Sequence, residues 1–89
     1  MKLDDNMIDA FCSVDDPDSM KKLFSEIFTS SELADLNLRW KLLSELGTGH
    51  TQRDIAKKLG VSLCKITRGS KILKNEKSLL RTFFQEKIR

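Results

Sequence analysis

Apolar side chains recur every three or four residues along most of this chain, which is the spacing of one face of an α-helix. Positions 7–12 carry the first such pattern, and a second follows Pro17, where Asp16 is placed to cap a helix. The apolar positions of these two segments are Met7, Ile8, Phe11, Cys12, Met20, Leu23, Phe24 and Ile27. Because the helical pattern continues from end to end, we expect an all-α fold of about six short helices.

Two further helices are expected, one longer and one at the end of the chain. Thr29 and Glu32 stand in the capping-box arrangement and should open the longer helix, which Gly47 and Gly49 should stop. The last helix is expected to follow Asn75 as its cap. The predicted apolar positions are Leu33, Leu36, Trp40, Leu43 and Leu46 in the longer helix, and Leu79, Leu80, Phe83, Phe84 and Ile88 in the last one. We expect Trp40 in the core and the last stripe against the core or a second subunit.

The segment from Thr51 to Ser70 carries the strongest structural signal. It predicts a cap at Thr51, a helix of about eight residues, a turn at Gly60 and a second helix capped by Ser62. Glycine suits the turn because it adopts the left-handed conformation without a steric penalty. The positions expected to face inward are Ile55, Ala56, Leu59, Val61 and Ile66. This is the pattern of a helix-turn-helix, although a helical pair that only resembles that motif would share it.

Charge is distributed unevenly along the chain. Residues 1–35 hold three basic and nine acidic side chains, a net charge of −6, whereas residues 36–89 hold thirteen basic and four acidic ones, a net charge of +9. Such asymmetry indicates that the second half faces a polyanion. A basic face that is merely solvated is the alternative, and the helix-turn-helix pattern favours duplex DNA.

In a helix-turn-helix the second helix enters the major groove with its first turns toward the bases. The residues expected near base edges are Leu63, Cys64, Lys65 and Thr67, and those placed for phosphates are Arg53, Lys57, Lys58 and Lys74. Gln52 completes the expected DNA-binding set.

Other functions find little support in the sequence. Cys12 and Cys64 have neither metal-ligand spacing nor a nearby histidine, so we expect two reduced thiols and no metal site. The sequence shows neither a nucleophile paired with a base nor paired carboxylates, so nothing in it indicates an enzyme. The chain has no apolar run near the roughly 18 residues of a membrane helix and no signal peptide, so we expect a cytoplasmic protein.

One residue breaks the helical pattern. Gly69 lies in the middle of the second helix of the expected helix-turn-helix, beside Arg68. A glycine inside a helix costs about 1 kcal/mol relative to alanine. The sequence therefore indicates that a side chain at this position would block a contact that the protein needs.

The residues "TQRDIAKKLG" followed by "ITRGSKILK" resemble the bacterial Trp repressor family, most strongly over Gln52–Lys74. The similarity extends more weakly through "TSSELADLNLRWKLLSEL" and into the last helix. It implies a single helical DNA-binding domain over residues 1–89 that forms an intertwined homodimer. In that fold, residues 1–49 and 75–89 would provide dimerisation helices and residues 51–74 the helix-turn-helix.

The resemblance also implies a ligand, L-tryptophan, which acts as corepressor of genes for tryptophan biosynthesis or uptake. Its indole would lie between Arg39 and Arg68 against Gly69, and Thr29 of the other subunit would meet its carboxylate. A guanidinium group can stack on an aromatic ring and can also bind a carboxylate. The same residues have a plainer interpretation, in which both arginines are solvated and Gly69 serves packing.

The sequence departs from the family pattern at several positions. Ile72 stands where a serine approaches the amino group of the ligand, and Glu26 where an apolar residue closes the pocket. Lys65 replaces a threonine, Ala56 replaces a lysine, and one residue is missing between Gly49 and Thr51. Two alternatives therefore remain beside the tryptophan-dependent repressor. One is a DNA-binding regulator of the same fold with a different ligand or none, and the other is a helical module that binds an acidic protein.

Overall fold

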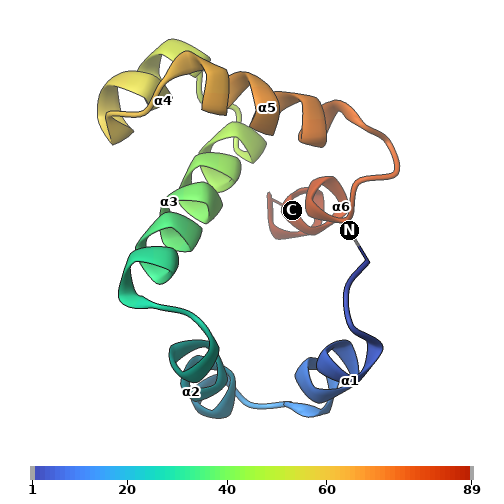
Figure 1. Ribbon diagram of the computed structural model, residues 1–89. Coiled ribbons are helices and arrows are strands. Elements are labelled where there is room, and N and C mark those ends of the chain that lie inside the picture. The colour runs from blue at the N-terminus through green and yellow to red at the C-terminus, as the bar shows by residue number, and fades with distance from the viewer. Residues whose placement is uncertain (1, 89) are drawn as a thin grey trace. The chain divides into compact units, whose positions relative to one another are not determined.

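The computed structural model describes residues 2–88, and it describes the side chains of residues 2–85. Within this range the chain forms α-helices and no β-strands, which confirms the all-α prediction (Figure 1). The helices are α1 (Asp5–Ser13), α2 (Pro17–Ile27), α3 (Ser30–Gly47), α4 (Gln52–Leu59), α5 (Leu63–Lys74) and α6 (Leu79–Ile88). They divide into two compact units, one that ends at Asp35 and one that begins at Leu36.

The first unit contains α1, α2 and the beginning of α3. Asp16 caps α2 as predicted, because its Oδ2 accepts a hydrogen bond of 2.8 Å from the backbone N–H of Ser19. Aromatic rings join α1 to α2, with Phe11 and Phe24 in an edge-to-face contact at a centroid distance of 5.7 Å. Phe24 also contacts Phe28, 5.4 Å away. Ring contacts therefore hold this small unit together in place of an extensive core.

The predicted capping box opens α3. The backbone N–H of Thr29 donates to Glu32 Oε1 at 2.8 Å, and the backbone N–H of Glu32 donates to Thr29 Oγ1 at 3.2 Å. The bond from the Thr29 amide lowers the pKa of Glu32, and the hydroxyl contact adds to this effect. Both signals were local, since the residues lie three positions apart.

The second unit has its core where α3, α4 and α5 meet. Ile55 of α4 and Ile66 of α5 are fully buried, and Leu42 of α3 is 5% exposed. The partly buried side chains packed against them are Leu43, Leu46, Ala56, Leu59 and Val61. The inward positions predicted for the helix-turn-helix are thus confirmed, with Ala56, Leu59 and Val61 half-buried.

The buried side of α3 differs from the prediction. Leu42, which the sequence analysis left out, is its most buried residue, whereas Leu36 is 37% and Trp40 is 45% exposed in the single chain. The expectation of a core position for Trp40 was therefore wrong for the single chain. Leucines lie on more than one side of α3, and the place where α5 packs decides which of them are covered. Trp40 instead lies against α6, with its ring 5.2 Å from that of Phe84.

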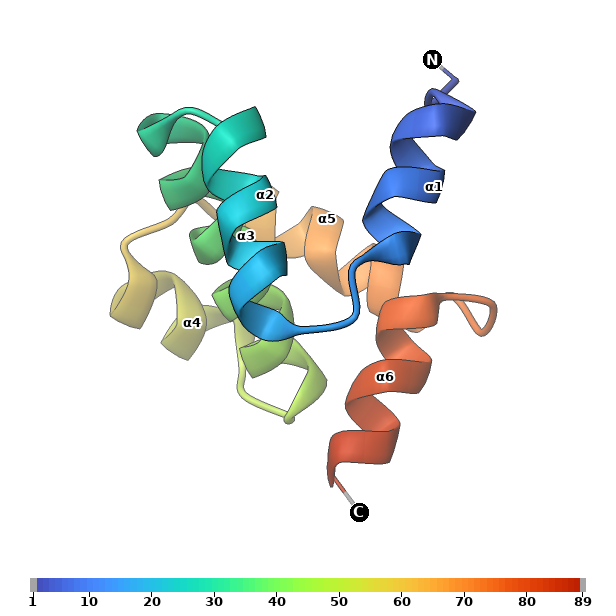
Figure 2. The ribbon, with the colours of Figure 1, turned by 90° about the horizontal axis from the view of Figure 1, so that it is seen from below.

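The cap of α6 also differs from the prediction. Ser78 caps this helix, because its Oγ accepts a bond of 3.2 Å from the backbone N–H of Arg81. Asn75 instead lies in the turn after α5, where its Oδ1 accepts a bond from the N–H of Lys77 at 2.9 Å. Figure 2 shows this turn between α5 and α6. The predicted apolar position Ile88 lies outside the residues whose side chains are described.

Candidate functional site

Helices α4 and α5 and the turn between them have the geometry of a helix-turn-helix. Thr51 Oγ1 accepts from the N–H of Asp54 at 3.2 Å and caps α4, and Ser62 Oγ accepts from the N–H of Lys65 at 3.4 Å and caps α5. Between them Gly60 has φ 64° and ψ 32°, the left-handed conformation that the sequence predicted. Each of these signals was read correctly from the sequence because each acts within three residues.

The burial of Ile55 and Ile66 decides which faces of the two helices point outward. Both side chains are fully buried against α3, so the opposite faces of α4 and α5 meet solvent. All residues predicted to bind DNA are exposed: Gln52, Arg53, Lys57, Lys58, Leu63, Cys64, Lys65, Thr67 and Lys74. The apolar Leu63, at the start of α5, is 57% exposed. An exposed leucine among cations, at the first turn of the second helix, is typical of a surface that contacts bases.

Thr67 has part of its hydrogen-bonding capacity used within its own helix. Its hydroxyl donates to the backbone oxygen of Leu63 at 2.9 Å. The hydroxyl oxygen can therefore serve only as an acceptor toward a base, and the methyl group remains for apolar contact.

Gly69 marks the closest approach of α5 to α3. It is buried, and a Cβ atom placed on it would lie 2.8 Å from Leu42 Cδ2, 3.1 Å from Leu46 Cδ1 and 3.3 Å from Leu43 Cδ2. The glycine thus permits a close contact between two helices. This contact supplies a packing reason for Gly69 that requires no ligand, and it is the plainer of the two interpretations of this residue.

We expect Gly69→Ala to lower the free energy of unfolding by about 1 kcal/mol, since overpacking costs about 1–3 kcal/mol and the better helix former returns up to about 1 kcal/mol. Leu42→Val removes the atoms nearest to the new methyl group. In that background Gly69→Ala should be neutral or stabilising. Urea unfolding of the four proteins in this cycle measures the coupling. Equal effects of Gly69→Ala in both backgrounds would contradict the packing role.

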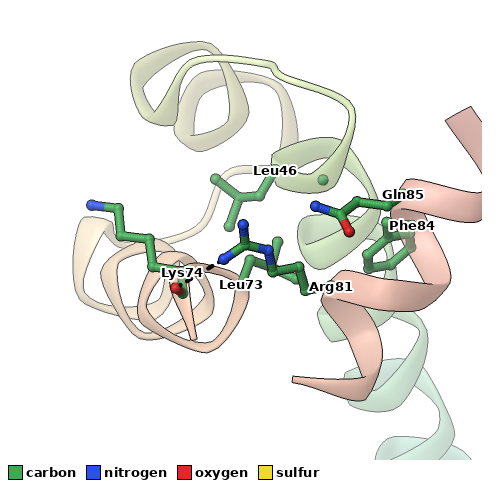
Figure 3. A pocket seen from close by; sticks show the side chains of 7 residues that line it. Leu46, Leu73, Lys74, Arg81, Phe84 and Gln85 are labelled. Atoms are coloured by element: carbon green, nitrogen blue, oxygen red, sulfur yellow. Dashed lines mark hydrogen bonds between the residues drawn. The ribbon is translucent and has the colours of Figure 1, made fainter. Parts of the chain in front are cut away.

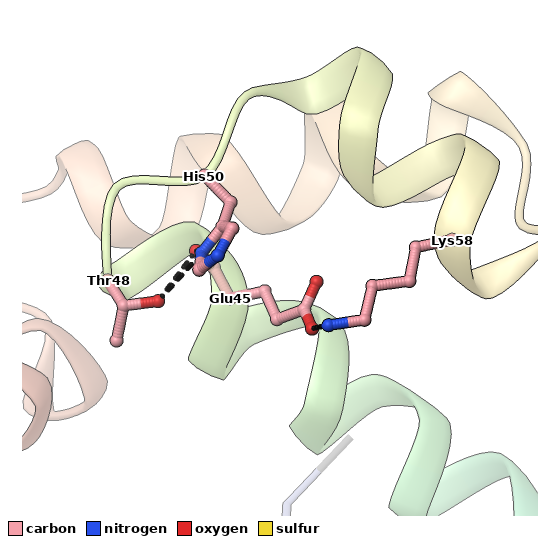
Figure 4. A network of polar contacts seen from close by, with 4 residues as sticks. All are labelled: Glu45, Thr48, His50 and Lys58. Carbon is pink, nitrogen blue, oxygen red and sulfur yellow. Dashed lines mark hydrogen bonds and ion pairs between the residues drawn. The ribbon is translucent and has the colours of Figure 1, made fainter.

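An ion pair links α3 to α4. Lys58 Nζ lies 2.5 Å from Glu45 Oε1, and His50 lies beside them, with its Nδ1 3.0 Å from Thr48 Oγ1 (Figure 4). The hydrogen bond from Lys58 lowers the pKa of Glu45 against the opposing effect of burial, and the charges of Lys58, His50 and Lys41 add to the lowering. Lys58 is therefore already paired with an acid of this chain.

A separate cavity of about 340 Å³ lies between the end of α3, the end of α5 and α6 (Figure 3). Leu46, Leu73 and Phe84 form its apolar side, and Lys74, Arg81 and Gln85 its polar side. Arg81 ties α6 to α5, because its Nη1 donates to the backbone oxygen of Lys74 at 3.1 Å. None of the residues predicted to bind tryptophan lines this cavity.

Comparison with known proteins accounts for this arrangement. Residues 3–88 match the family described as Trp repressor protein. The chain is 40% identical over 83 residues to a Trp operon repressor homolog of Xylella fastidiosa strain M23, a match that covers 92% of this chain and 88% of that protein. It is also 40% identical over 70 residues to a Trp operon repressor homolog of Chlamydia trachomatis serovar D, with coverages of 78% and 74%.

The chain belongs to the Trp repressor family. This is a family of transcriptional regulators that bind DNA through a helix-turn-helix, and a repressor role follows for this member. The resemblance predicted from "TQRDIAKKLG" and "ITRGSKILK" is therefore confirmed. The helix-turn-helix of the structure is the part of the Trp repressor fold that lies in residues 51–74.

The residues that the Trp repressor resemblance assigns to a ligand lie in two places. Arg39, Arg68, Gly69 and Ile72 belong to the second unit, and Thr29 belongs to the first. Arg39 is exposed one helical turn before the leucines that meet Gly69, and Arg68 and Ile72 are exposed on α5. Arg39 and Arg68 thus lie on the two helices, α3 and α5, that meet at Gly69. Thr29 Oγ1 accepts a backbone bond in the capping box, which leaves its hydroxyl proton able to donate to a carboxylate.

Sequence analysis did not find the roles of Glu45 and Arg81. Glu45 pairs with a lysine 13 positions away, and Arg81 binds a carbonyl seven positions away, so no local pattern reveals either contact. Among the described side chains of residues 2–85, no group of three or more histidine, cysteine, aspartate or glutamate residues is arranged to hold a metal ion. None of the helices in the described range combines the length and apolar character needed to cross a bilayer.

Proposed function

We propose that this Trp repressor family member binds operator DNA as a homodimer in the cytoplasm, with L-tryptophan as corepressor, and represses genes of tryptophan biosynthesis or uptake. The observation that carries the proposal is the exposed, basic outer face of α5, whose inner face packs on the core through the buried Ile66. A helix presented in this way fits the major groove of duplex DNA.

The proposed DNA contacts divide by their position on the helix-turn-helix. Leu63, Cys64, Lys65 and Thr67 lie in the first turns of α5 and would reach base edges. Gln52, Arg53, Lys57 and Lys74 would contact the sugar-phosphate backbone and set the orientation of the protein on the duplex. Operator affinity would fall as salt rises, because each contacted phosphate releases counterions.

Dimerisation through residues 1–49 and 75–89 is supported by the apolar side chains that the single chain leaves in water. Leu79 is 86% exposed, and Trp40 and Leu36 are also exposed. Large apolar side chains gathered on a small protein favour association with a second copy. A dimer would place two α5 helices in successive major grooves, about 34 Å apart.

The proposed corepressor site combines two arginines with a glycine. The indole of L-tryptophan would stack between Arg39 and Arg68, and Gly69 would leave space at its edge. Thr29 of the partner subunit would donate to the ligand carboxylate. A ligand held between α3 and α5 would set the position of α5, so ligand and DNA would each strengthen the binding of the other by the same factor.

A second candidate function is DNA binding by the same fold with a different ligand or none. Two observations favour it. The leucines of α3 already pack against Gly69, and the apolar Ile72, 37% exposed, offers no hydroxyl to an amino group. Replacement of Gly69 by a bulky residue does not separate the two functions, because it would also disturb the contact between α3 and α5.

Thermal unfolding with added ligands separates the two candidates. The purified protein is compared in buffer, L-tryptophan, indole, tryptamine and L-phenylalanine. A ligand present at about 100 times its dissociation constant stabilises the folded state by about 2.7 kcal/mol. For a domain of this size, in which 1 kcal/mol shifts the melting temperature by about 4–8 degrees, that corresponds to a shift of about 11–22 degrees.

A shift confined to L-tryptophan would support the corepressor site, and a shift with indole or tryptamine alone would support a changed specificity at Ile72. No shift with any ligand, in protein shown to be folded and dimeric, would contradict the ligand proposal. DNA binding is tested separately by selection of duplexes from a random-sequence library, with unrelated DNA as competitor. Failure to enrich any sequence with and without L-tryptophan would contradict operator binding.

A further inference from the structure

The ion pair between α3 and α4 engages Lys58. The helix-turn-helix pattern places this lysine for contact with a DNA phosphate. Lys58 Nζ and Glu45 Oε1 are 2.5 Å apart. The side chain of Lys58 is 60% exposed, whereas that of Glu45 is only 12% exposed. A mostly buried acid therefore holds the ammonium group of a lysine that stands at the protein surface. Figure 4 shows the two side chains in contact.

Glu45 depends on Lys58 for its hydrogen bonding. Its second carboxylate oxygen, Oε2, is buried and has no hydrogen-bond partner among the described residues. The nearby His50 approaches the backbone oxygen of Glu45 at 3.3 Å and makes no hydrogen bond to its carboxylate. If Lys58 moved away to bind another anion, a mostly buried charge would lose the one ion-pair partner that it has among the described side chains, which is strongly unfavourable. The pair is therefore expected to persist when the protein meets DNA.

The neighbouring Lys57 has different surroundings. Successive residues of an α-helix point about 100° apart, so the two lysines cannot both face α3. Lys57 is exposed, and within residues 2–88 the ion pair engages Lys58 only. Of two adjacent lysines on α4, one is thus available to a phosphate and the other is held by the chain itself.

We propose that Glu45 acts as an internal substitute for a DNA phosphate. Its carboxylate holds Lys58 on α3 and so keeps this lysine from contacting the duplex. This inference rests on the proposed function, since it concerns the strength of DNA binding. Glu45 is in this sense a positioning residue that acts through Lys58. It limits the number of phosphates that each chain contacts, and so limits the electrostatic affinity that is independent of sequence.

The test measures how operator affinity depends on salt. The probe is the duplex that the wild-type protein selects from the random-sequence library, titrated between 50 and 200 mM salt. Glu45→Gln removes the charge that holds Lys58, since a neutral amide binds an ammonium group more weakly than a carboxylate does. One added phosphate contact per bound chain should steepen the slope of log affinity against log salt by about 0.9 per chain. Affinity at 50 mM salt should rise accordingly.

Four matched variants separate this effect from general electrostatics. Lys58→Gln alone should leave the slope unchanged, whereas Lys57→Gln should reduce it by about 0.9 per chain. Adding Lys58→Gln to Glu45→Gln should abolish the steeper slope. Glu76→Gln removes the same charge from an exposed turn residue, and it should leave the slope unchanged. If Glu45→Gln does not fold, as judged by circular dichroism, Glu45→Met replaces it, since methionine also removes the charge and its flexible apolar side chain fills a similar space.

Several outcomes would overturn the inference. A reduced slope in Lys58→Gln would mean that Lys58 already contacts a phosphate. An unchanged slope in folded Glu45→Gln and Glu45→Met, or a steeper slope that survives in the double variant, would mean that Glu45 does not act through Lys58. Each of these results requires a wild-type protein that binds the selected duplex. Failure of the wild type to select any duplex would instead contradict the proposed function.

Discussion

Replacement of Ile66 by alanine is expected to lower the free energy of unfolding by about 3 kcal/mol, within the range of about 2–5 kcal/mol for large-to-small changes in cores. Ile66 is fully buried and packs in one cluster with Leu42 and Ile55, so the lost atoms leave a cavity between three helices. A domain of this size has little stability to spare. Urea unfolding followed by circular dichroism, at one protein concentration, measures the change.

Leu63→Ala provides the matched control for this prediction. It makes a similar apolar truncation on the same helix, but Leu63 is 57% exposed, so its loss should change the free energy of unfolding by less than about 0.5 kcal/mol. Ile66→Val should cost about 1 kcal/mol, between the two. A cost below about 1 kcal/mol for Ile66→Ala would contradict the burial of α5 on α3.

Attachment of a maleimide to Cys64 is expected to weaken binding to the selected duplex at least about 1,000-fold, the lower limit of the usual gap between specific and non-specific affinity. Cys64 is exposed in the first turn of α5, where a bulky adduct would stand between the helix and the bases. The experiment uses a Cys12→Ser protein, because Cys12 is also an exposed thiol. Fluorescence anisotropy of labelled DNA measures the loss.

The control is a Cys12→Ser, Cys64→Ser protein treated with the same reagent. It has no thiol to react, since the sequence holds two cysteines, and it should bind the duplex as well after treatment as before. Circular dichroism of the Cys64 adduct checks that the helices are intact. Binding of the Cys64 adduct within about fivefold of the unmodified protein would place the base-reading surface elsewhere, since a blocked recognition helix loses its specific contacts.

The elements of this fold were predictable where their signals are local. The caps at Asp16, Thr29, Thr51 and Ser62 act through hydrogen bonds to residues three positions ahead, and these were found. The left-handed conformation of Gly60 was also found. The cap of α6 was missed because Asn75 and Ser78 are both suitable caps. The turn that precedes the helix decides between them, and its shape depends on how α6 is tied to α5.

The residues of the candidate site show the same division. The sequence identified the exposed faces of α4 and α5, because burial of Ile55 and Ile66 follows from helical periodicity and leaves the opposite faces in solvent. It identified Gly69 as unusual and offered two reasons for it. Only the crossing of α5 over α3 shows that the glycine meets leucine side chains. The assignment of Arg39, Arg68, Ile72 and Thr29 to a tryptophan site remains a prediction.

The all-α class, the helix-turn-helix and the family could be read from the chain, because these depend on hydrogen bonds and periodicities within a few residues. The core position of Leu42 rather than Trp40 and the pairing of Lys58 with Glu45 became visible only once the helices were packed. Contacts between helices depend on their crossing angle and separation. These are set by all the packed side chains together and leave no mark at a fixed spacing in the sequence.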